Sequence, residues 1–171
     1  MAQPLPGWAA KPRGDRTHIS KHIPLLIRAH HLLCLLTYAG KGYTPEFIAN
    51  LDEIVARINA GQEEIKLIEG PDIICGPMRS CQDHPQFHCD LPRIQARDER
   101  ALAAINMLRQ KLNQPPLRLN DHLIIDAFWL AQMRAAFKAK DLRAACEGCE
   151  WYDTCTEIAE EDFKPARLGQ K

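Results

Sequence analysis

Apolar residues recur at helical spacing through the middle of the chain. Between residues 45 and 60 they stand three and four positions apart, which is the period of a helix with one buried face. Thr44 can cap the start of this helix, Pro45 suits its first turn, and Gly61 can end it. The pattern therefore predicts an amphipathic helix over 45–60.

Two further stretches have the same period. One helix is predicted over 92–112, and another over 121–138, where Asn120 or Asp121 can provide the N-cap. The pair Pro115-Pro116 separates them, because proline interrupts a helix. Shorter helices are predicted over 30–39, from residue 141 to Cys146, and for one or two turns within 151–160.

Two short apolar runs have the character of strands. They span 23–28 and 65–68, and the segment 25–28 can pair with 65–68. Residues 70–90 form a loop rich in Gly, Pro, Cys and His, and a loop of this length in a compact domain is usually functional or disordered. We therefore predict a predominantly helical α+β fold with about five helices and a small two-stranded β element.

Length and composition favour one domain. The 171 residues are 46% hydrophobic, which is enough for a single core. We expect a flexible arm over 1–22, a cysteine-rich domain over 23–162 and a C-terminal tail over 163–171. There is no secretory signal and no apolar run long enough to span a membrane. The formal net charge of zero gives no indication of nucleic-acid binding.

Seven cysteines in a chain without a secretory signal indicate a reducing compartment, so we expect a cytoplasmic protein. In that setting clustered thiols more often bind metal than form disulfides. The odd number also leaves at least one cysteine outside any fully paired set. A disulfide framework and buried inert thiols remain the alternatives.

The strongest motif is C-E-G-C-E-W-Y-D-T-C, which places Cys146, Cys149 and Cys155 within ten residues. Two residues between the first two thiols allow both to face one centre, and Gly148 relieves the tight backbone. This run supplies at most three ligands, so a fourth must come from elsewhere. The spacing suits Zn²⁺ and iron–sulfur clusters alike.

A second group of candidates lies in R-A-H-H-L-L-C. On a helix Cys34 is four residues from His30 and three from His31, so either histidine can share a face with the thiol. Ordinary core packing of these three side chains is the competing interpretation. The motif is not the H-E-x-x-H pattern of zinc proteases, so it gives metal-dependent hydrolysis no support.

The loop over 70–90 supplies the remaining thiols. Cys75 and Cys89 are candidate ligands, because irregular structure offers cysteine little reason for packing. Cys81 is the weakest candidate of the three. His84 and His88 are interpreted as solvated loop residues.

The pattern resembles a family of small bacterial and archaeal proteins known as DUF1284. The similar blocks are R-A-H-H-L-L-C-L-L-T-Y-A-G-K-G-Y-T-P-E-F (28–47), D-I-I-C (72–75), R-D-E-R-A-L (97–102) and the cysteine motif at 146–155. Many relatives carry a cysteine at the position of Met78. Members are often labelled iron–sulfur binding proteins, so the resemblance implies a cofactor but names no reaction.

Seven thiols and two histidines exceed what a single closed zinc site needs. A cluster takes four ligands, usually all cysteine. The expected set is Cys146, Cys149, Cys155 and Cys75, with Cys89 or Cys34 as substitutes and His30 and His31 as additional candidates. A [4Fe–4S] cluster is favoured over [2Fe–2S], and Zn²⁺ is the alternative. Basic residues before the motif, such as Arg134 and Arg143, can offset the charge of the thiolates.

Three functions are compatible with these residues. The first is an iron–sulfur protein for electron transfer, redox sensing or cluster handling, with a redox or other protein as partner. The second is a structural zinc module that mediates protein contacts. The third is an enzyme that uses the cluster or Cys34 with an adjacent histidine as nucleophile and base. No nucleotide-binding motif and no G-x-S-x-G motif is present.

Overall fold

The computed structural model describes residues 23–61 and 63–170. The arm expected over 1–22 lies outside these residues. The predominantly helical α+β prediction is confirmed, with helices and a small sheet around one core. In chain order the elements are β1 (Leu25–Arg28), α1 (Ala29–Thr37), α2 (Pro45–Asn59), β2 (Glu64–Ile68), α3 (Gly76–Arg79), α4 (Pro92–Lys111), β3 (His122–Ile124), α5 (Ala127–Lys138), the 3₁₀ turn η1 (Arg143–Cys146) and α6 (Tyr152–Glu160).

The sheet has the order β1-β2-β3. The strands β1 and β2 are parallel, with Leu25 opposite Ile65 and Arg28 opposite Ile68, so the predicted pairing of these segments is confirmed. The strand β3 is antiparallel to β2 and adds an edge that the sequence did not predict. Ile27 and Leu67 have no exposed surface, which fixes one face of the sheet against the core.

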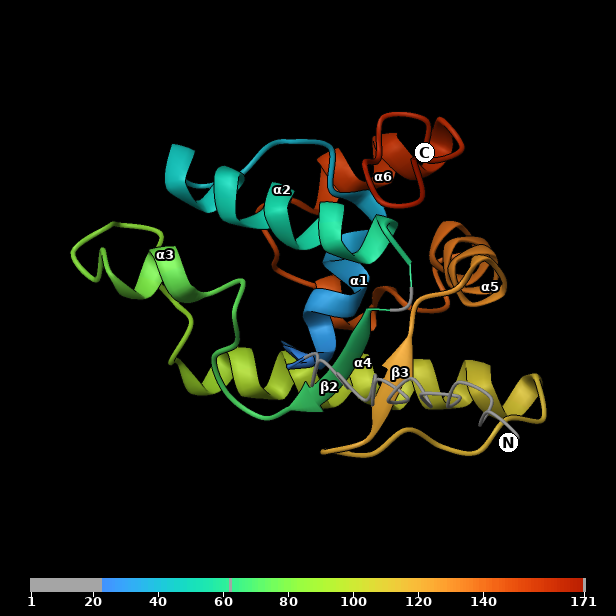
Figure 1. Ribbon diagram of the computed structural model, residues 1–171. Coiled ribbons are helices and arrows are strands. Elements are labelled where there is room, and N and C mark those ends of the chain that lie inside the picture. The colour runs from blue at the N-terminus through green and yellow to red at the C-terminus, as the bar shows by residue number, and fades with distance from the viewer. Residues whose placement is uncertain (1–22, 62, 171) are drawn as a thin grey trace, which may run out of the picture.

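Helix α1 follows β1 without a connecting residue and lies at the centre of the molecule. Figure 1 shows it with α2 above, α4 below and α5 to one side. Seven of its nine residues are buried, which is typical of a helix surrounded by protein. The position of α1 matters for function because His30, His31 and Cys34 lie on it.

Helix α2 has the capping structure that its sequence predicts. The Thr44 hydroxyl accepts a hydrogen bond of 3.1 Å from the Phe47 amide, and Pro45 occupies the first turn. Its buried face consists of Phe47, Leu51, Ile54, Val55 and Ile58. The buried face of α2 is thus the side that the apolar spacing identified.

The helix predicted over 121–138 is wrong in its first part. Residues 122–124 form β3, and helix α5 begins at Ala127 after the N-cap Asp126, whose carboxylate accepts a 2.7 Å hydrogen bond from the Trp129 amide. Asn120 has a φ of 71°, so it turns the chain instead of starting a helix. Pairing with β2 therefore outweighs the local helical spacing here.

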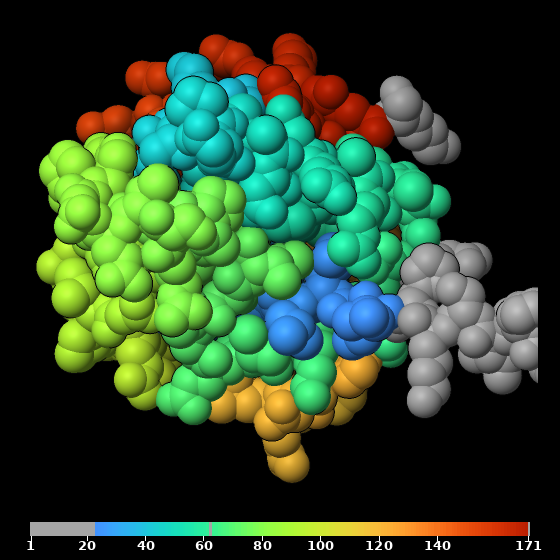
Figure 2. Space-filling model, turned by 60° about the vertical axis from the view of Figure 1, so that its left-hand side comes forward, coloured from blue at the N-terminus to red at the C-terminus, as the bar shows by residue number. Residues whose placement is uncertain are grey.

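Two segments expected to lack regular structure pack on the domain. The loop over 70–90 contains the single helical turn α3, with Met78 buried. Figure 2 brings this side forward and shows the α3 segment lying against α2 in one continuous surface. In the C-terminal segment over 163–170, Phe163, Ala166 and Leu168 are buried in the core. These segments close the molecule around the two ends of α1.

Candidate cofactor site

A cavity of about 130 Å³ lies beside α1. Its wall combines α1, the loop that carries α3, and the segment from η1 to the first turns of α6. Six of the seven cysteines line it, together with both histidines of α1: Cys34, Cys75, Cys89, Cys146, Cys149, Cys155, His30 and His31. Candidates from three separate parts of the sequence thus converge on one space.

Cys34 is placed by the helix that carries it. Among the nine residues of α1, only His31 and Cys34 are not buried, and they lie three residues apart on one face. Both line the cavity. The accessible surface of Cys34 therefore faces the interior space, although leucines surround the thiol on the same helix.

The C-terminal motif folds as a tight knuckle followed by a helix. The Cys149 amide donates to the Cys146 carbonyl at 3.0 Å, and the Tyr152 amide donates to the Cys149 carbonyl at 3.1 Å. Gly148 has a φ of 68°, a conformation that glycine adopts without strain. Helix α6 then carries Cys155 back to the same cavity.

Four thiols are electrostatic neighbours. Burial raises the pKa of Cys34, and the charges of Cys149, Cys155 and Cys146 raise it further. Burial likewise raises the pKa values of Cys146 and Cys155, although neighbouring donors oppose the effect. A metal ion would therefore have to displace the protons of Cys34, Cys146 and Cys155 on binding. We call Cys34, Cys146, Cys149 and Cys155 the four-thiol group.

Two arginines reach the cavity beside the four-thiol group. Arg143 is 5% exposed, and its guanidinium lies over the rings of Phe137 and Tyr152 at 4.4 and 4.1 Å. Its charge and its hydrogen bond lower the pKa of Cys146. The Nε atoms of Arg143 and Arg97 are buried without an oxygen or nitrogen partner, and both side chains line the cavity. The site therefore offers buried cationic donors to an anionic group.

Other basic residues near the motif have structural partners instead. The Arg134 guanidinium donates to the carbonyls of Leu36 and Leu168 and lies 5.0 Å from the ring of Phe163. Lys138 pairs with Asp162 at the surface. Of Arg134, Lys138, Lys140 and Arg143, Arg143 alone lines the cavity, although the Nε of Arg134 is also buried without a partner.

Each histidine of α1 is oriented by an aspartate. His30 Nδ1 donates to Asp98 Oδ1, and His31 Nδ1 donates to Asp72 Oδ2, both at 2.7 Å. A carboxylate can only accept, so each ring presents an unprotonated Nε2 when it is neutral. Burial lowers the pKa of His30 to about 4. Burial also disfavours the protonated form of His31. The charge and the hydrogen bond of Asp72 favour that form, and the pKa of His31 is raised.

Asp72 is fully engaged as a hydrogen-bond acceptor. Its Oδ2 accepts from the Arg28 amide at 2.8 Å as well as from His31, and its Oδ1 accepts from the amides of Ile74 and Cys75 at 2.9 and 3.2 Å. Burial alone would raise its pKa, but His31 and these donors hold it below the usual value. Asp72 therefore acts as an orienting group for His31.

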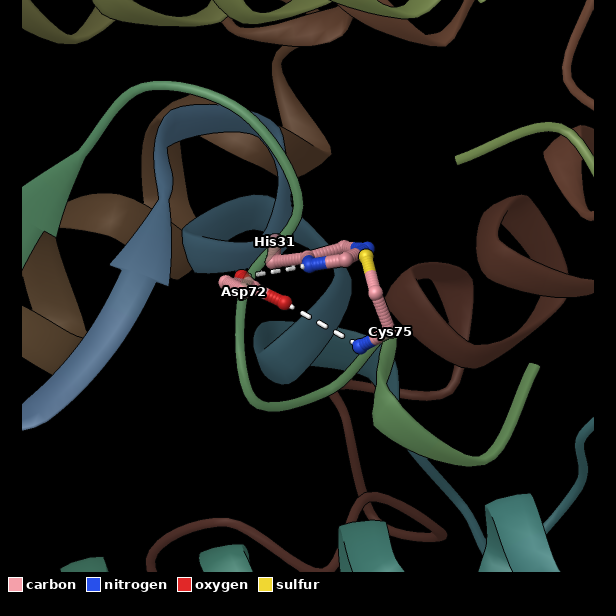
Figure 3. Close-up of side chains that lie close together, drawn as sticks. All are labelled: His31, Asp72 and Cys75. Atoms are coloured by element: carbon pink, nitrogen blue, oxygen red, sulfur yellow. Dashed lines mark hydrogen bonds and ion pairs between the residues drawn. The ribbon is translucent and has the colours of Figure 1, made fainter. Parts of the chain in front are cut away.

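Cys75 and Cys89 form a second thiol pair in the cavity wall. Both are buried, and the two thiols lie next to each other. Figure 3 shows the outer ring nitrogen of His31 beside the sulfur of Cys75, with Asp72 on the opposite side of the ring. The Cys75 thiol donates to Cys89 and lowers the Cys89 pKa, while the pKa of Cys75 is raised.

Ligand spacing separates these two groups. Among the described residues, the one set of three ligand atoms within 4.8 Å of one another consists of His31, Asp72 and Cys75. The sulfurs of the four-thiol group are spread more widely around the cavity. A tetrahedral zinc site with Zn–S bonds of about 2.3 Å would place its sulfurs about 3.8 Å apart.

The structure thus brings Cys146, Cys149 and Cys155 together with Cys34, which was a substitute in the expected ligand set. It places Cys75, the first choice, beside Cys89. Cys81 is exposed, does not line the cavity and sits in the same loop. His88 lines the cavity with its ring 5.7 Å from that of Tyr43, whereas His84 does not line it.

Two aspartates at the site were not among the sequence candidates. Asp72 and Asp98 lie within the D-I-I-C and R-D-E-R-A-L blocks that carry the family resemblance, so a signal was present. Their partners are 41 and 68 residues away in sequence, and this separation hid their role. Arg28 joins them, because its amide donates to Asp72 and its Nε to Asp98.

No helix of the described residues has the length and apolar character to cross a membrane. No curated protein and no solved structure matches the chain. A family model described as "Protein of unknown function (DUF1284)" matches residues 42–155, which include the cysteine motif but not Cys34. This match covers well over half of the sequence, so the chain belongs to the DUF1284 family.

Proposed function

We propose that this protein is a redox protein that binds an iron–sulfur cluster, [4Fe–4S] in preference to [2Fe–2S], through Cys34, Cys146, Cys149 and Cys155. The observation that carries the proposal is a cavity walled by four thiols from two distant segments, spaced more widely than the ligands of a single zinc ion. Four thiolates are the usual ligands of such clusters.

The size of the cavity supports a group of several atoms. A cavity needs only about 10–15 Å³ to hold one water molecule. The volume here is about 130 Å³, which is an order of magnitude larger than a single small ligand needs. A mononuclear metal ion would leave most of that space unused.

The residues around the thiols suit the charge of a cluster. Four thiolates make an anionic site, and the buried Nε atoms of Arg143 and Arg97 can donate to it. Thr37 donates a 3.1 Å hydrogen bond to Cys155 Sγ. Trp151 and Tyr43 line the cavity with their rings 5.7 Å apart. A bound cluster would supply a one-electron couple, whose potential depends on such donors and on burial.

The second candidate is a structural zinc module. It is favoured by the C-x-x-C knuckle, which zinc uses as readily as a cluster does. A zinc site would require the four sulfurs to move inward and the cavity to contract. The two candidates therefore differ in composition, in colour and in the spacing of the ligands.

Anaerobic purification with analysis of iron, zinc and acid-labile sulfide tests the proposal. We expect a brown protein with iron and sulfide in equal amounts and an absorption band that bleaches on reduction. Colourless protein with one zinc and no sulfide, obtained under strict exclusion of air, would establish the zinc module instead.

Serine variants of each cysteine test the ligand set. We expect Cys34→Ser, Cys146→Ser, Cys149→Ser and Cys155→Ser to lose most of the iron, while Cys81→Ser keeps it. Cys81 is the matched control because it is an exposed thiol of the same protein outside the cavity. Full iron content in the Cys149→Ser protein would place the site elsewhere.

A further inference from the structure

The second thiol pair, Cys75 and Cys89, is not part of the ligand set that we propose for the cofactor. A chain of polar contacts begins at Asp72 and continues through His31 to Cys75 and Cys89. His31 Nδ1 lies 2.7 Å from Asp72 Oδ2, and one ring nitrogen of His31 lies within 4.8 Å of Cys75 Sγ. Figure 3 shows the outer ring nitrogen beside this sulfur. Cys89 follows as the thiol next to Cys75.

This chain resembles a nucleophile with its base and an orienting carboxylate. Asp72 fixes the ring orientation of His31 and the tautomer that leaves Nε2 free to accept a proton. The Cys75 backbone is itself held by its amide bond to Asp72 Oδ1 at 3.2 Å. His31 is therefore positioned to take a proton from Cys75.

The two thiols differ in exposure. Cys75 is 2% exposed and Cys89 is 9% exposed, and both line the cavity. The cavity wall also includes Lys41 and Gln86, which are exposed, so the space reaches the surface. Cys89 is therefore the more accessible of the two thiols.

We propose that Cys75 and Cys89 are a redox-active dithiol that reduces small disulfides, with Cys89 as the attacking thiol and His31 as the base for Cys75. This activity goes beyond cluster binding and does not depend on it. The pair shares the cavity with the four-thiol group but contributes no ligand to it.

The reaction is two successive thiol–disulfide exchanges. The Cys89 thiolate attacks one sulfur of a substrate disulfide, which breaks the S–S bond, forms a mixed disulfide and releases the other sulfur as a thiolate that takes a proton from water. His31 then accepts the proton of Cys75, and the Cys75 thiolate attacks Cys89 Sγ. This step forms the Cys75–Cys89 disulfide and releases the second substrate sulfur, which takes the proton from His31. One disulfide is reduced to two thiols, and the protein dithiol is oxidised by two electrons.

Local charge favours these roles. The hydrogen bond from Cys75 lowers the pKa of Cys89, and Arg28 lies nearby with its Nη1 donating to the Cys89 carbonyl at 3.0 Å. A thiol whose pKa is close to the ambient pH is the most effective attacking group in exchange. Cys75 keeps its proton until His31 removes it, which sets the order of the two steps.

The test uses the full chain with Cys81→Ser as the parent, because Cys81 and Cys89 share the tryptic peptide 80–93 while Cys75 lies on 67–79. The anaerobically purified protein is treated with 2-hydroxyethyl disulfide and mapped by mass spectrometry. We expect one disulfide that joins these two peptides, with unchanged iron content. In Cys75→Ser the mixed disulfide on Cys89 should persist, and in Cys89→Ser reaction at Cys75 should be at least about tenfold slower.

His31→Gln tests the base. We expect about 10²-fold slower closure of the Cys75–Cys89 disulfide at neutral pH. The closure rate should also lose its rise with pH, which a purely structural role would not produce.

No linkage between 67–79 and 80–93 in folded protein, or equal reactivity of Cys75 and Cys89, would overturn the proposal. Loss of iron in Cys75→Ser would overturn it as well, because Cys75 would then be a ligand. Absence of iron from the parent would refute the cluster alone and leave the dithiol test intact.

Discussion

The hydroxyl of Thr37 donates a hydrogen bond of 3.1 Å to the sulfur of Cys155, 118 residues further along the chain. This bond joins α1 to α6 at the point where Cys34 and Cys155 face the cavity. It lowers the pKa of Cys155 against the stronger effect of burial, which raises it. A donor to a ligand sulfur stabilises negative charge on that sulfur and so favours the reduced state of a bound cluster.

Thr37→Val removes this donor and preserves the shape of the side chain. We expect the variant to bind iron normally and to have a reduction potential lower by tens of millivolts, on the order of the value of one hydrogen bond to a charged group. Protein-film voltammetry measures the change. Thr156→Val is the control, because Thr156 contacts Arg143 and the Tyr152 carbonyl but does not line the cavity. Equal potentials in wild type and Thr37→Val would show that the bond does not act on the cofactor.

Arg143 is predicted to tune the same potential by its charge. Arg143→Met retains an unbranched chain that can pack on Phe137 and Tyr152 but removes the cation beside Cys146. We expect a more negative potential and faster loss of iron in air. Arg134→Met serves for comparison, since Arg134 does not line the cavity. The same iron loss in both variants would point to general destabilisation and against an electrostatic role.

The ion pair of Arg28 and Asp98 is expected to dominate the stability of this region. Arg28 is 1% exposed and donates from Nε to Asp98 Oδ2 at 2.7 Å. Arg28→Met leaves a partly buried carboxylate without its cation, which costs about 3–5 kcal/mol. Urea denaturation of the cofactor-free protein measures this loss. Lys111→Met, which breaks the exposed pair with Asp141, should cost no more than about 1 kcal/mol. Similar losses in the two variants would contradict the assignment.

His30 predicts a specific dependence of stability on pH. Its pKa is about 4 in the folded protein and 6.5 in the unfolded chain, so only the unfolded chain takes up a proton between these values. The free energy of unfolding should therefore fall as pH decreases from 6.5 to 4, by about 3 kcal/mol in total. His31 acts in a different window. Its raised pKa contributes stability that is complete below pH 6.5 and lost at higher pH.

His30→Gln isolates the first effect. The free energy of unfolding of the variant should lack this fall between pH 6.5 and 4. Above pH 6.5 the difference in free energy of unfolding between the variant and wild type should not change with pH. Chemical denaturation at several pH values provides the measurement. Parallel curves for the two proteins throughout this range would show that His30 titrates normally in the folded state.

Cofactor binding should order two segments selectively. The segment 80–91 contacts the residue that follows the knuckle at 146–149, because Gln86 Nε2 donates an exposed hydrogen bond of 2.7 Å to Glu150 Oε2. Hydrogen exchange should show added protection in both segments with cofactor and unchanged protection in α2 and α4, which have their own apolar faces. Equal protection in both forms would mean that the cofactor does not join these segments.

Sequence reasoning succeeded where structure is locally determined. Thr44 and Pro45 start α2 through their own capping chemistry, and the knuckle of Cys146 and Cys149 needs only its spacing and Gly148. It failed at His122–Ile124, because those residues become a strand only when β2 lies beside them. The choice between Cys34 and Cys75 is of the same kind. Both are thiols in suitable motifs, and only the packing of α1 decides which one faces Cys155.

The central position of α1 has a consequence for how the protein is made. Cys34 leaves the ribosome more than a hundred residues before Cys155, the partner across the cavity. At about 5–20 residues per second this interval is roughly 6–24 s. During that time the first thiol of the four-thiol group is exposed on an unfinished chain, while the knuckle does not yet exist. Loading of the proposed four-ligand cofactor must therefore wait until Cys155 has been translated, and an early thiol that binds the wrong metal or is oxidised would block it.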